Sequence, residues 1–386
     1  MTPGILLLTL AYVLSQFFRA FLAVLAPVLE RDLGTGPEAL AFASGLWFLV
    51  FAAMQIPVGW ALDHLGPRRT ASVLLMIGGG GGAAVFGMAT SAQHINIAMA
   101  LIGIGCSPVL MAAYYIFARQ YPPRQFATLA ALIIGVGSIG NLIASYPMAF
   151  AAETLGWRAA LFWLAGGSAV VAAGIWACVR DPQKPEGEAK GRLMDLLRLP
   201  AIWLILPLMF VSYAPAGAIR GLWVGPYLAE TFDLSTGQIG QATLVMGLAM
   251  ILGTFVYGPL DKVFGTRKWV VFAGNLLAMV AIFGLAVLPD QSPLVSVGLL
   301  AIIGFFGASF PMLIAHGRGF FPAHLTGRGV TLLNLFGIGG AGLMQFASGQ
   351  VHGAVTLAPY PAIFAFFGVA LAAGLIVYGF ARDNMT

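Results

Sequence analysis

The chain has 386 residues, of which 60% are hydrophobic and only 9% are charged. A soluble globular protein carries roughly 25% charged residues, so this chain has too few charges to cover a water-facing surface. The composition therefore excludes a soluble enzyme, a disordered chain, a collagen-like fibre and a disulfide scaffold. The net charge of +5 does not indicate a nucleic-acid partner, because basic residues gathered on one side of a membrane give the same sum.

Apolar stretches long enough to cross a membrane, which requires about 20 residues, follow one another along the whole sequence. In chain order they are residues 4–29, 38–61, 70–90, 95–118, 126–151, 157–179, 201–228, 238–260, 269–288, 293–316, 327–349 and 360–381. The N-terminus has no basic stretch and no small-residue cleavage site, so we expect the first span to be retained. The sequence predicts an all-α polytopic membrane protein with twelve transmembrane helices.

The longest polar segment, residues 180–198, separates the sixth span from the seventh. It predicts an N-terminal six-helix bundle (1–179), a cytoplasmic linker (180–198) and a C-terminal six-helix bundle (199–386). Fifteen of the nineteen Lys and Arg residues fall on the side of the N-terminus, and two fall in the opposite loops. This bias predicts that both termini are cytoplasmic. We expect a monomer surrounded by lipid, in the bacterial cytoplasmic (inner) membrane.

The two halves repeat at an offset near 200 residues. The matches include Tyr12, Arg19 and Asp32 with Tyr213, Arg220 and Asp233 at an offset of 201, and Gly66 and Arg68 with Gly265 and Arg267 at 199. A duplicated six-span unit crosses the membrane in the same sense each time, which predicts two pseudo-symmetric bundles related by an axis along the membrane normal. We expect a site at their interface, near the midplane.

The loop after the second span carries Gly59, Asp63, Gly66, Arg68 and Arg69 in the pattern G-x-x-x-D-x-x-G-x-R-R. This pattern resembles the loop motif of the major facilitator superfamily. A degenerate second copy, with its aspartate one position early, contains Asp261, Gly265, Arg267 and Lys268. In that family the motif latches the cytoplasmic ends of the halves and assists conformational switching. The resemblance therefore implies a gating role for both copies, with Asp63 paired to Arg119 and Asp261 paired to Arg318.

Two arginines, Arg19 and Arg220, lie inside predicted spans, each roughly 15 Å from the outer end of its helix. Placing Arg at the centre of a membrane helix costs on the order of 2.5–3.5 kcal/mol on insertion scales. All fourteen acidic residues lie in loops or at span ends, which favours a mobile partner for the arginines, namely an anionic substrate. Snorkelling to the outer surface and pairing with Glu30 or Glu230 are the structural alternatives.

Other polar side chains are further candidate ligands. Helical spacing places Tyr12 and Gln16 near Arg19, and Tyr213 and Trp223 near Arg220. Spans four, five and eleven contribute Tyr114, Tyr115, Ser138, Asn141 and Asn334, for which helix packing is the more common role. The glycine run 78–82 indicates close packing or a soft helix and not a phosphate loop, because no Lys-Ser/Thr follows it. His316, near the inner end of span ten, is a candidate proton carrier because histidine as a residue type titrates near neutral pH, and an interfacial histidine without that role is the more common alternative.

The segment from Gln16 to Leu22 also resembles part of the organophosphate:phosphate antiporter branch of the superfamily. In that branch, arginines of spans one and seven grip an anionic headgroup, and Arg19 and Arg220 match that pair. We therefore expect a secondary transporter, not an enzyme, which moves a small carboxylate- or phosphate-bearing anion by alternating access. A proton or counter-anion is the favoured co-substrate, with uniport as the alternative, and no cofactor or metal is expected. A proton-coupled exporter of drugs or other small molecules, and a non-transporting membrane sensor, are the alternatives.

The predicted topology can be tested by labelling a variant in which Cys106 and Cys178 are replaced. A single cysteine introduced between residues 181 and 198 should react with a membrane-impermeant maleimide only from the cytoplasmic side. A cysteine in place of Asp290, in the predicted outer loop between spans nine and ten, should react only from outside. Reaction of the first cysteine from outside would overturn the topology.

Overall fold

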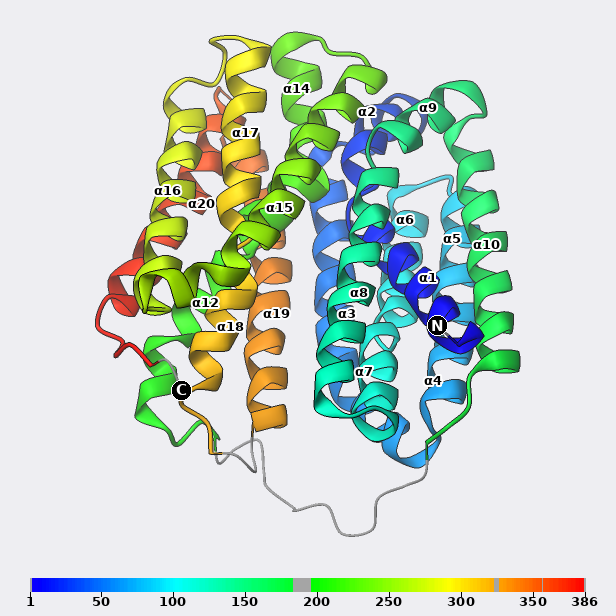
Figure 1. Ribbon diagram of the computed structural model, residues 1–386. Coiled ribbons are helices and arrows are strands. Elements are labelled where there is room, and N and C mark those ends of the chain that lie inside the picture. Colours follow the sequence, from blue (N-terminus) through cyan, green and yellow to red (C-terminus); the bar gives the residue numbers. More distant parts are fainter. Residues whose placement is uncertain (1, 183–195, 323–325, 356, 385–386) are drawn as a thin grey trace. The chain divides into compact units, whose positions relative to one another are not determined.

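The computed structural model describes residues 2–182, 196–322, 326–355 and 357–384. In these ranges every regular element is a helix (Figure 1). Eleven of the described helices are long and apolar enough to cross a membrane, and the bent pair α1 (Pro3–Phe18) and α2 (Leu22–Leu33) gives a twelfth span when counted as one. The prediction of an all-α polytopic membrane protein is confirmed.

The chain forms two compact units, one of Met1–Glu186 with Ser235–Gln241 and the other of Gly187–Leu234 with Ala242–Thr386. After α1 and α2, the first unit contains α3 (Pro37–His64), α4 (Pro67–Leu74), η1 (Leu75–Gly81), α5 (Gly82–Gly87), α6 (Ala92–Cys106), α7 (Val109–Gln120), α8 (Pro123–Ile143), α9 (Tyr146–Thr154) and α10 (Trp157–Cys178). The second unit contains η2 (Pro200–Leu204), α12 (Leu206–Ser212), α13 (Ala214–Ala218), η3 (Ile219–Trp223), α14 (Val224–Phe232), most of α15 (Thr236–Phe264), α16 (Lys268–Val287), α17 (Pro293–Gly307), α18 (Phe310–Arg318), α19 (Thr326–Ala354) and α20 (Pro359–Tyr378).

The first span of each half is interrupted near its middle. Helices α1 and α2 meet at an angle of 51° across a short break that begins at Arg19. In the second unit the equivalent span contains the π-helical segment η3, in which Arg220 lies. The sequence predicted continuous spans at 4–29 and 201–228, so both interruptions are corrections to those expectations.

The third span also contains a π-helical segment, η1, which covers most of the glycine run. Segment η1 packs against α6, and a Cβ atom on Gly105 would lie 2.6 Å from the carbonyl carbon of Gly78. Because the two backbones touch, only glycine fits at the crossing. Of the two expectations for this run, close packing is confirmed.

Packing within each unit buries one side of every span and leaves an apolar side exposed. In the first unit α1 lies beside α8 and α10, and α3 lies beside α6 (Figure 1). In the second unit α16 packs against α17 and α20, and α12 packs against α19 and α20. Exposed residues include Trp163 at 77% and Leu294 at 82% of their full accessible area. Such an apolar exterior suits lipid and not water.

From the close crossing of η1 and α6, we expect two glycine substitutions to differ strongly in their effect on the stability of the protein. Gly105→Ala places its methyl group against the backbone of Gly78 and Gly79, so we expect overpacking that costs about 1–3 kcal/mol. Gly166→Ala, on an exposed side of α10 with open space around its Cβ position, should be neutral or stabilising. Thermal unfolding of both variants in detergent tests this; a Gly105→Ala protein as stable as wild type contradicts the close approach.

Candidate functional site

The arginine of the first unit lies beside two aromatic rings. Arg19 is the residue after the last turn of α1, and its guanidinium carbon lies 5.3 Å from the ring centre of Trp47 and 5.7 Å from that of Phe51. Those two rings, one turn apart on α3, stack on each other at 5.1 Å. Stacking uses the face of a guanidinium, whereas hydrogen bonds form in its plane, so the two kinds of contact do not compete.

A chain of hydrogen bonds joins the predicted polar residues of α1 and α8. Asn141 donates through Nδ2 to Oε1 of Gln16 at 3.2 Å, and Gln16 donates through Nε2 to the hydroxyl of Tyr12 at 2.5 Å. Tyr12 and Gln16 are both buried. The amides of Asn141 and Gln16 therefore bond to each other, which joins α8 to α1 within one turn of Arg19.

The other predicted residues of the first unit lie in different settings. The hydroxyl of Ser138 donates to the carbonyl of Ile134 in its own helix at 3.0 Å, so it supports α8. The ring centre of Tyr115 lies 3.5 Å from the guanidinium of Arg119 at the end of α7, which links it to the loop motif. Tyr114 packs against the apolar core of the unit.

The arginine of the second unit is more deeply enclosed. Arg220 is only 4% exposed and lies within η3. Tyr213, between α12 and α13, places its ring 5.1 Å from the ring of Phe310 on α18. A π-helical turn displaces the side chains that follow it from ordinary helical positions, and such turns are frequent at functional sites.

Trp223, three residues after Arg220, contacts two residues of α19. The indole N–H of Trp223 donates to Oγ of Ser348 at 2.9 Å, and its ring stacks on His352 at 5.3 Å. Trp223 is fully buried, so its only donor is already used and its described contacts are those of a supporting residue. Asn334, three turns before the buried amide of Gln345 on the same helix, is half-buried.

The first copy of the loop motif is assembled around an aspartate that follows the sixth span. Asp181 accepts a hydrogen bond from the backbone N–H of Arg68 at 2.8 Å and so caps α4. Gly66 has a φ of +88°, and a Cβ atom there would lie 2.6 Å from the carboxyl carbon of Asp181. Gly66 is thus required by its backbone angle and by this approach.

The remaining residues of the first copy lie on the surface at the same end of the unit. Asp63 lies 4.0 Å from Nη2 of Arg119, so the implied pair forms at the limit of ion-pair distance. Arg69 is exposed, and Gly59 has open space around its Cβ position. The first copy therefore resembles the motif of the superfamily in contacts as well as in spacing.

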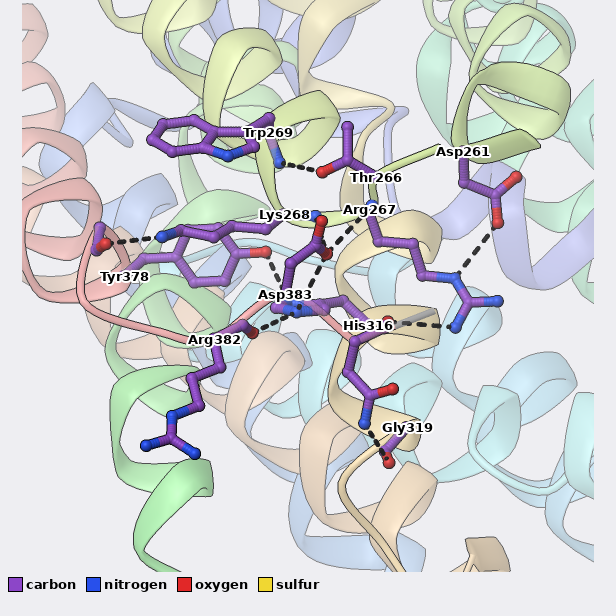
Figure 2. Close-up of polar contacts among 12 residues, drawn as sticks. Asp261, Thr266, Arg267, Lys268, Trp269, His316, Gly319, Tyr378, Arg382 and Asp383 are labelled. Atoms are coloured by element: carbon purple, nitrogen blue, oxygen red, sulfur yellow. Dashed lines mark hydrogen bonds and ion pairs between the residues drawn. The ribbon is translucent and has the colours of Figure 1, made fainter. Parts of the chain in front are cut away.

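The second copy differs in its ion pair and keeps the cap (Figure 2). Asp261 accepts a hydrogen bond from Nε of Arg267 at 3.2 Å and not from Arg318, which is exposed at the end of α18. Asp383 accepts from the backbone N–H groups of Lys268 at 3.0 Å and Arg267 at 3.3 Å, and so caps α16. The implied Asp261–Arg318 pair is thus replaced by a pair within the motif.

Further contacts attach the chain after α20 to the same place (Figure 2). Lys268 donates to the carbonyl of Gly379 at 2.8 Å, while Gly265, with a φ of +64°, forms the turn before α16. His316 is fully buried, with Nδ1 2.7 Å from the hydroxyl of Tyr378 and Nε2 3.0 Å from the carbonyl of Arg382. These bonds give His316 a role in holding α18 to the end of α20.

Sequence reasoning missed three kinds of feature at these sites. Trp47 and Phe51 were detectable as an aromatic pair at helical spacing on span two. The caps were detectable from the dipeptide Arg-Asp, which recurs at 180–181 and 382–383, an offset of 202. The interruption at Arg19 has no adjacent proline or glycine, whereas Pro215, Gly217 and Gly221 lie close to Arg220 and mark a weakened helix there. Within the described ranges no group of three or more His, Cys, Asp or Glu residues is arranged to hold a metal ion.

The family follows from the sequence, which matches the Major Facilitator Superfamily over residues 8–224 and again over 205–384. The chain belongs to this superfamily of transporters. It is 25% identical to the MFS-type transporter YfnC of Bacillus subtilis (strain 168) over 381 residues, 95% of this chain and 90% of YfnC. The sialic acid transporter NanX of Escherichia coli (strain K12) is 24% identical over 351 residues, 86% of this chain and 82% of NanX. A D-xylose–proton symporter has the same fold, with a TM-score of 0.79 at 15% identity over 99% of this chain and 98% of that one.

The cap at α16 predicts a pH-dependent stability in this superfamily member. Burial raises the pKa of Asp383, but hydrogen bonds from Thr266 and from the backbone of Lys268 and Arg267 outweigh it, and the pKa lies below its ordinary value. The stabilisation is therefore present above the pKa of an unfolded aspartate and is lost as the pH falls through the lowered folded pKa.

Asp383→Ala should lower the free energy of unfolding by about 1 kcal/mol at pH 7. The difference from wild type should shrink when both proteins are unfolded below about pH 4. Asp290→Ala, which removes an exposed loop aspartate, is the matched control and should change stability little. Thermal unfolding in detergent across this pH range measures the effect; equal stability of Asp383→Ala and wild type at pH 7 contradicts the cap.

Proposed function

We propose that this superfamily member transports a small organic anion, with Arg19 and Arg220 binding its negative group. The observation that carries this proposal is the equivalence of the two arginines. They lie 201 residues apart at matching positions of the repeat, and each lies at an interruption of the first helix of its unit. Interrupted membrane helices expose backbone dipoles and free side chains from regular packing, which suits them to binding charged substrates.

The chemistry of the guanidinium group supports an oxyanion as the ligand. Its donors form a planar fork that matches a carboxylate or phosphate, and it stays protonated even in an apolar setting. Beside Arg19, the rings of Trp47 and Phe51 orient that plane. The relationship to a sialic acid transporter agrees with this proposal, because sialic acid carries a carboxylate.

Alternating access in this fold moves the halves about a central substrate. We assign the gating role to the loop motifs and their caps, which lie far along the chain from the arginines. The proposal also includes coupling to a proton or to a counter-anion and residence in the bacterial cytoplasmic membrane. It places both termini in the cytoplasm, because Lys and Arg are concentrated in the loops on the side of the N-terminus.

Variants of the two arginines test the proposal. Arg19→Ala and Arg220→Ala should each weaken anion binding, since truncating one partner of a buried charge pair costs roughly 2–5 kcal/mol, or about 30-fold to several-thousand-fold in affinity. Arg→Lys at either position should also impair binding, because the charge remains but the fork is lost. Binding of sialic acid, D-glucuronate and glycerol 3-phosphate to purified protein, followed by uptake into proteoliposomes, provides the measurement.

Arg31→Ala is the matched control, because that side chain is 75% exposed at the end of α2. It should bind and transport as the wild type does. If Arg19→Ala and Arg220→Ala both retain wild-type affinity for the anion that the wild type binds, the arginines have structural or gating roles and the proposal is wrong.

A further inference from the structure

Besides Arg220, the second unit contains a buried side chain, Gln345, with the properties of a substrate-binding residue. Gln345, on α19, is 0% exposed, and neither its Oε1 nor its Nε2 has a hydrogen-bond partner in the part of the chain that the structure describes. More than nine-tenths of buried polar groups in proteins are paired, and a buried unpaired group is costly. Both a donor and an acceptor of the same amide are left open here.

The position of Gln345 relates it to Arg220. Ser348 and His352 follow Gln345 along one stripe of α19, and both contact Trp223. Arg220 precedes Trp223 by about one turn on its helix, as Gln345 precedes Ser348 on α19. The two helices run in the same direction, and α13, directly before η3, packs against α19. Gln345 therefore lies on the face of α19 that is turned toward the segment carrying Arg220.

Comparison of the halves explains why this amide is open. In the first unit Asn141 of α8 donates to Gln16 of α1, and Gln16 donates to Tyr12. At the offset of 201, Tyr213 stands in the place of Tyr12 and Gly217 stands in the place of Gln16. The counterpart of Asn141 at this offset is Gly342, and Gln345 lies about one turn further along α19. The second unit has thus kept the tyrosine and has an amide on α19, but it has lost the glutamine that joins the two helices in the first unit.

Resting on the function proposed above, we propose that Gln345 binds a hydroxyl or amide group of the organic anion whose charge Arg220 binds. Such a group donates one hydrogen bond and accepts another, as an open carboxamide requires. The substrate class is then a hydroxylated or amidated organic acid, such as a sugar acid, and not a bare inorganic anion or an apolar carboxylate. Sites built to bond a substrate hydroxyl reject the analogue that lacks it, because their own polar groups are left unpaired.

Two probes of similar size test this assignment. D-Glucuronate and cyclohexanecarboxylate both carry a carboxylate on a six-membered ring, and only the first carries hydroxyls. The wild type should bind D-glucuronate at least tenfold more tightly. Gln345→Leu should weaken D-glucuronate binding about 10- to 100-fold, the effect of losing hydrogen bonds to a buried group. The same substitution should change cyclohexanecarboxylate binding by less than threefold.

Two further variants separate this role from a structural one. Gln350→Leu, an exposed glutamine on another side of α19, should change neither affinity. Gly217→Gln rebuilds the amide partner of the first unit and should lower D-glucuronate affinity selectively. The nearest neighbour of a Cβ atom there is the ring of Tyr213 at 3.1 Å, which must shift slightly. Should Gly217→Gln fail to fold, Gln345→Leu decides alone.

The outcomes distinguish this proposal from the one on which it rests. Equal weakening of both probes by Gln345→Leu, or no weakening of either, would overturn the role of Gln345 while leaving the arginines untouched. Wild-type protein that binds neither probe, or binds both equally, would overturn the substrate class. The arginine proposal would fail in a different way: the Arg220→Ala variant would bind both probes with the affinity of the wild type.

Discussion

Every polar group at the depth of the hydrocarbon must find its partner within the protein or on a ligand, since lipid supplies none. Most polar side chains inside these spans meet that requirement locally. Asn275 donates to the carbonyl of Val271 at 2.9 Å and to Ser309 at 3.0 Å, and Thr9 donates to the carbonyl of Ile5 at 2.8 Å. Such bonds hold helices together and leave nothing for a substrate. Polar groups that are already paired within the protein can therefore be regarded as structural, and those left unpaired are candidates for binding a ligand.

The sequence predicted the all-helical fold and its spans because these depend on composition and on the length of apolar stretches. Arg19 and Arg220 stand out simply as charges within apolar stretches. The break after Phe18 was not predictable, because no residue there forbids a regular helix and the irregularity depends on neighbouring helices. Around Arg220, Pro215 and Gly221 weaken a regular helix but do not specify a π-helical turn. The partner of Asp261 was misjudged for a simpler reason. Moving the aspartate by one position turns it by about 100° around its helix, which directs it to Arg267.

The duplicated halves have diverged in the way each treats its arginine. In the first unit Arg19 rests on an aromatic pair, and the amides below it bond to one another. In the second unit Arg220 is enclosed within a π-helical segment, and Gln345 has no internal partner among the described residues. The proposed role of Gln345 is consistent with this divergence, because a hydroxyl of an asymmetric substrate needs a partner in only one of the two halves.

The aspartate caps of the loop motifs have a structural role that complements the proposed binding role of the arginines. Asp181 and Asp383 follow the sixth and the last spans, and each fixes the start of the third span in its own half. In each half, the chain that follows the last span is thereby bonded to the start of the third span, so the end of the half is joined to a helix from its first part. Alternating access demands that each half move as a body while its ligand-binding residues keep their places. A cap made of a carboxylate and backbone N–H groups meets that demand, because it joins segments of one half and makes no bond that the motion must break.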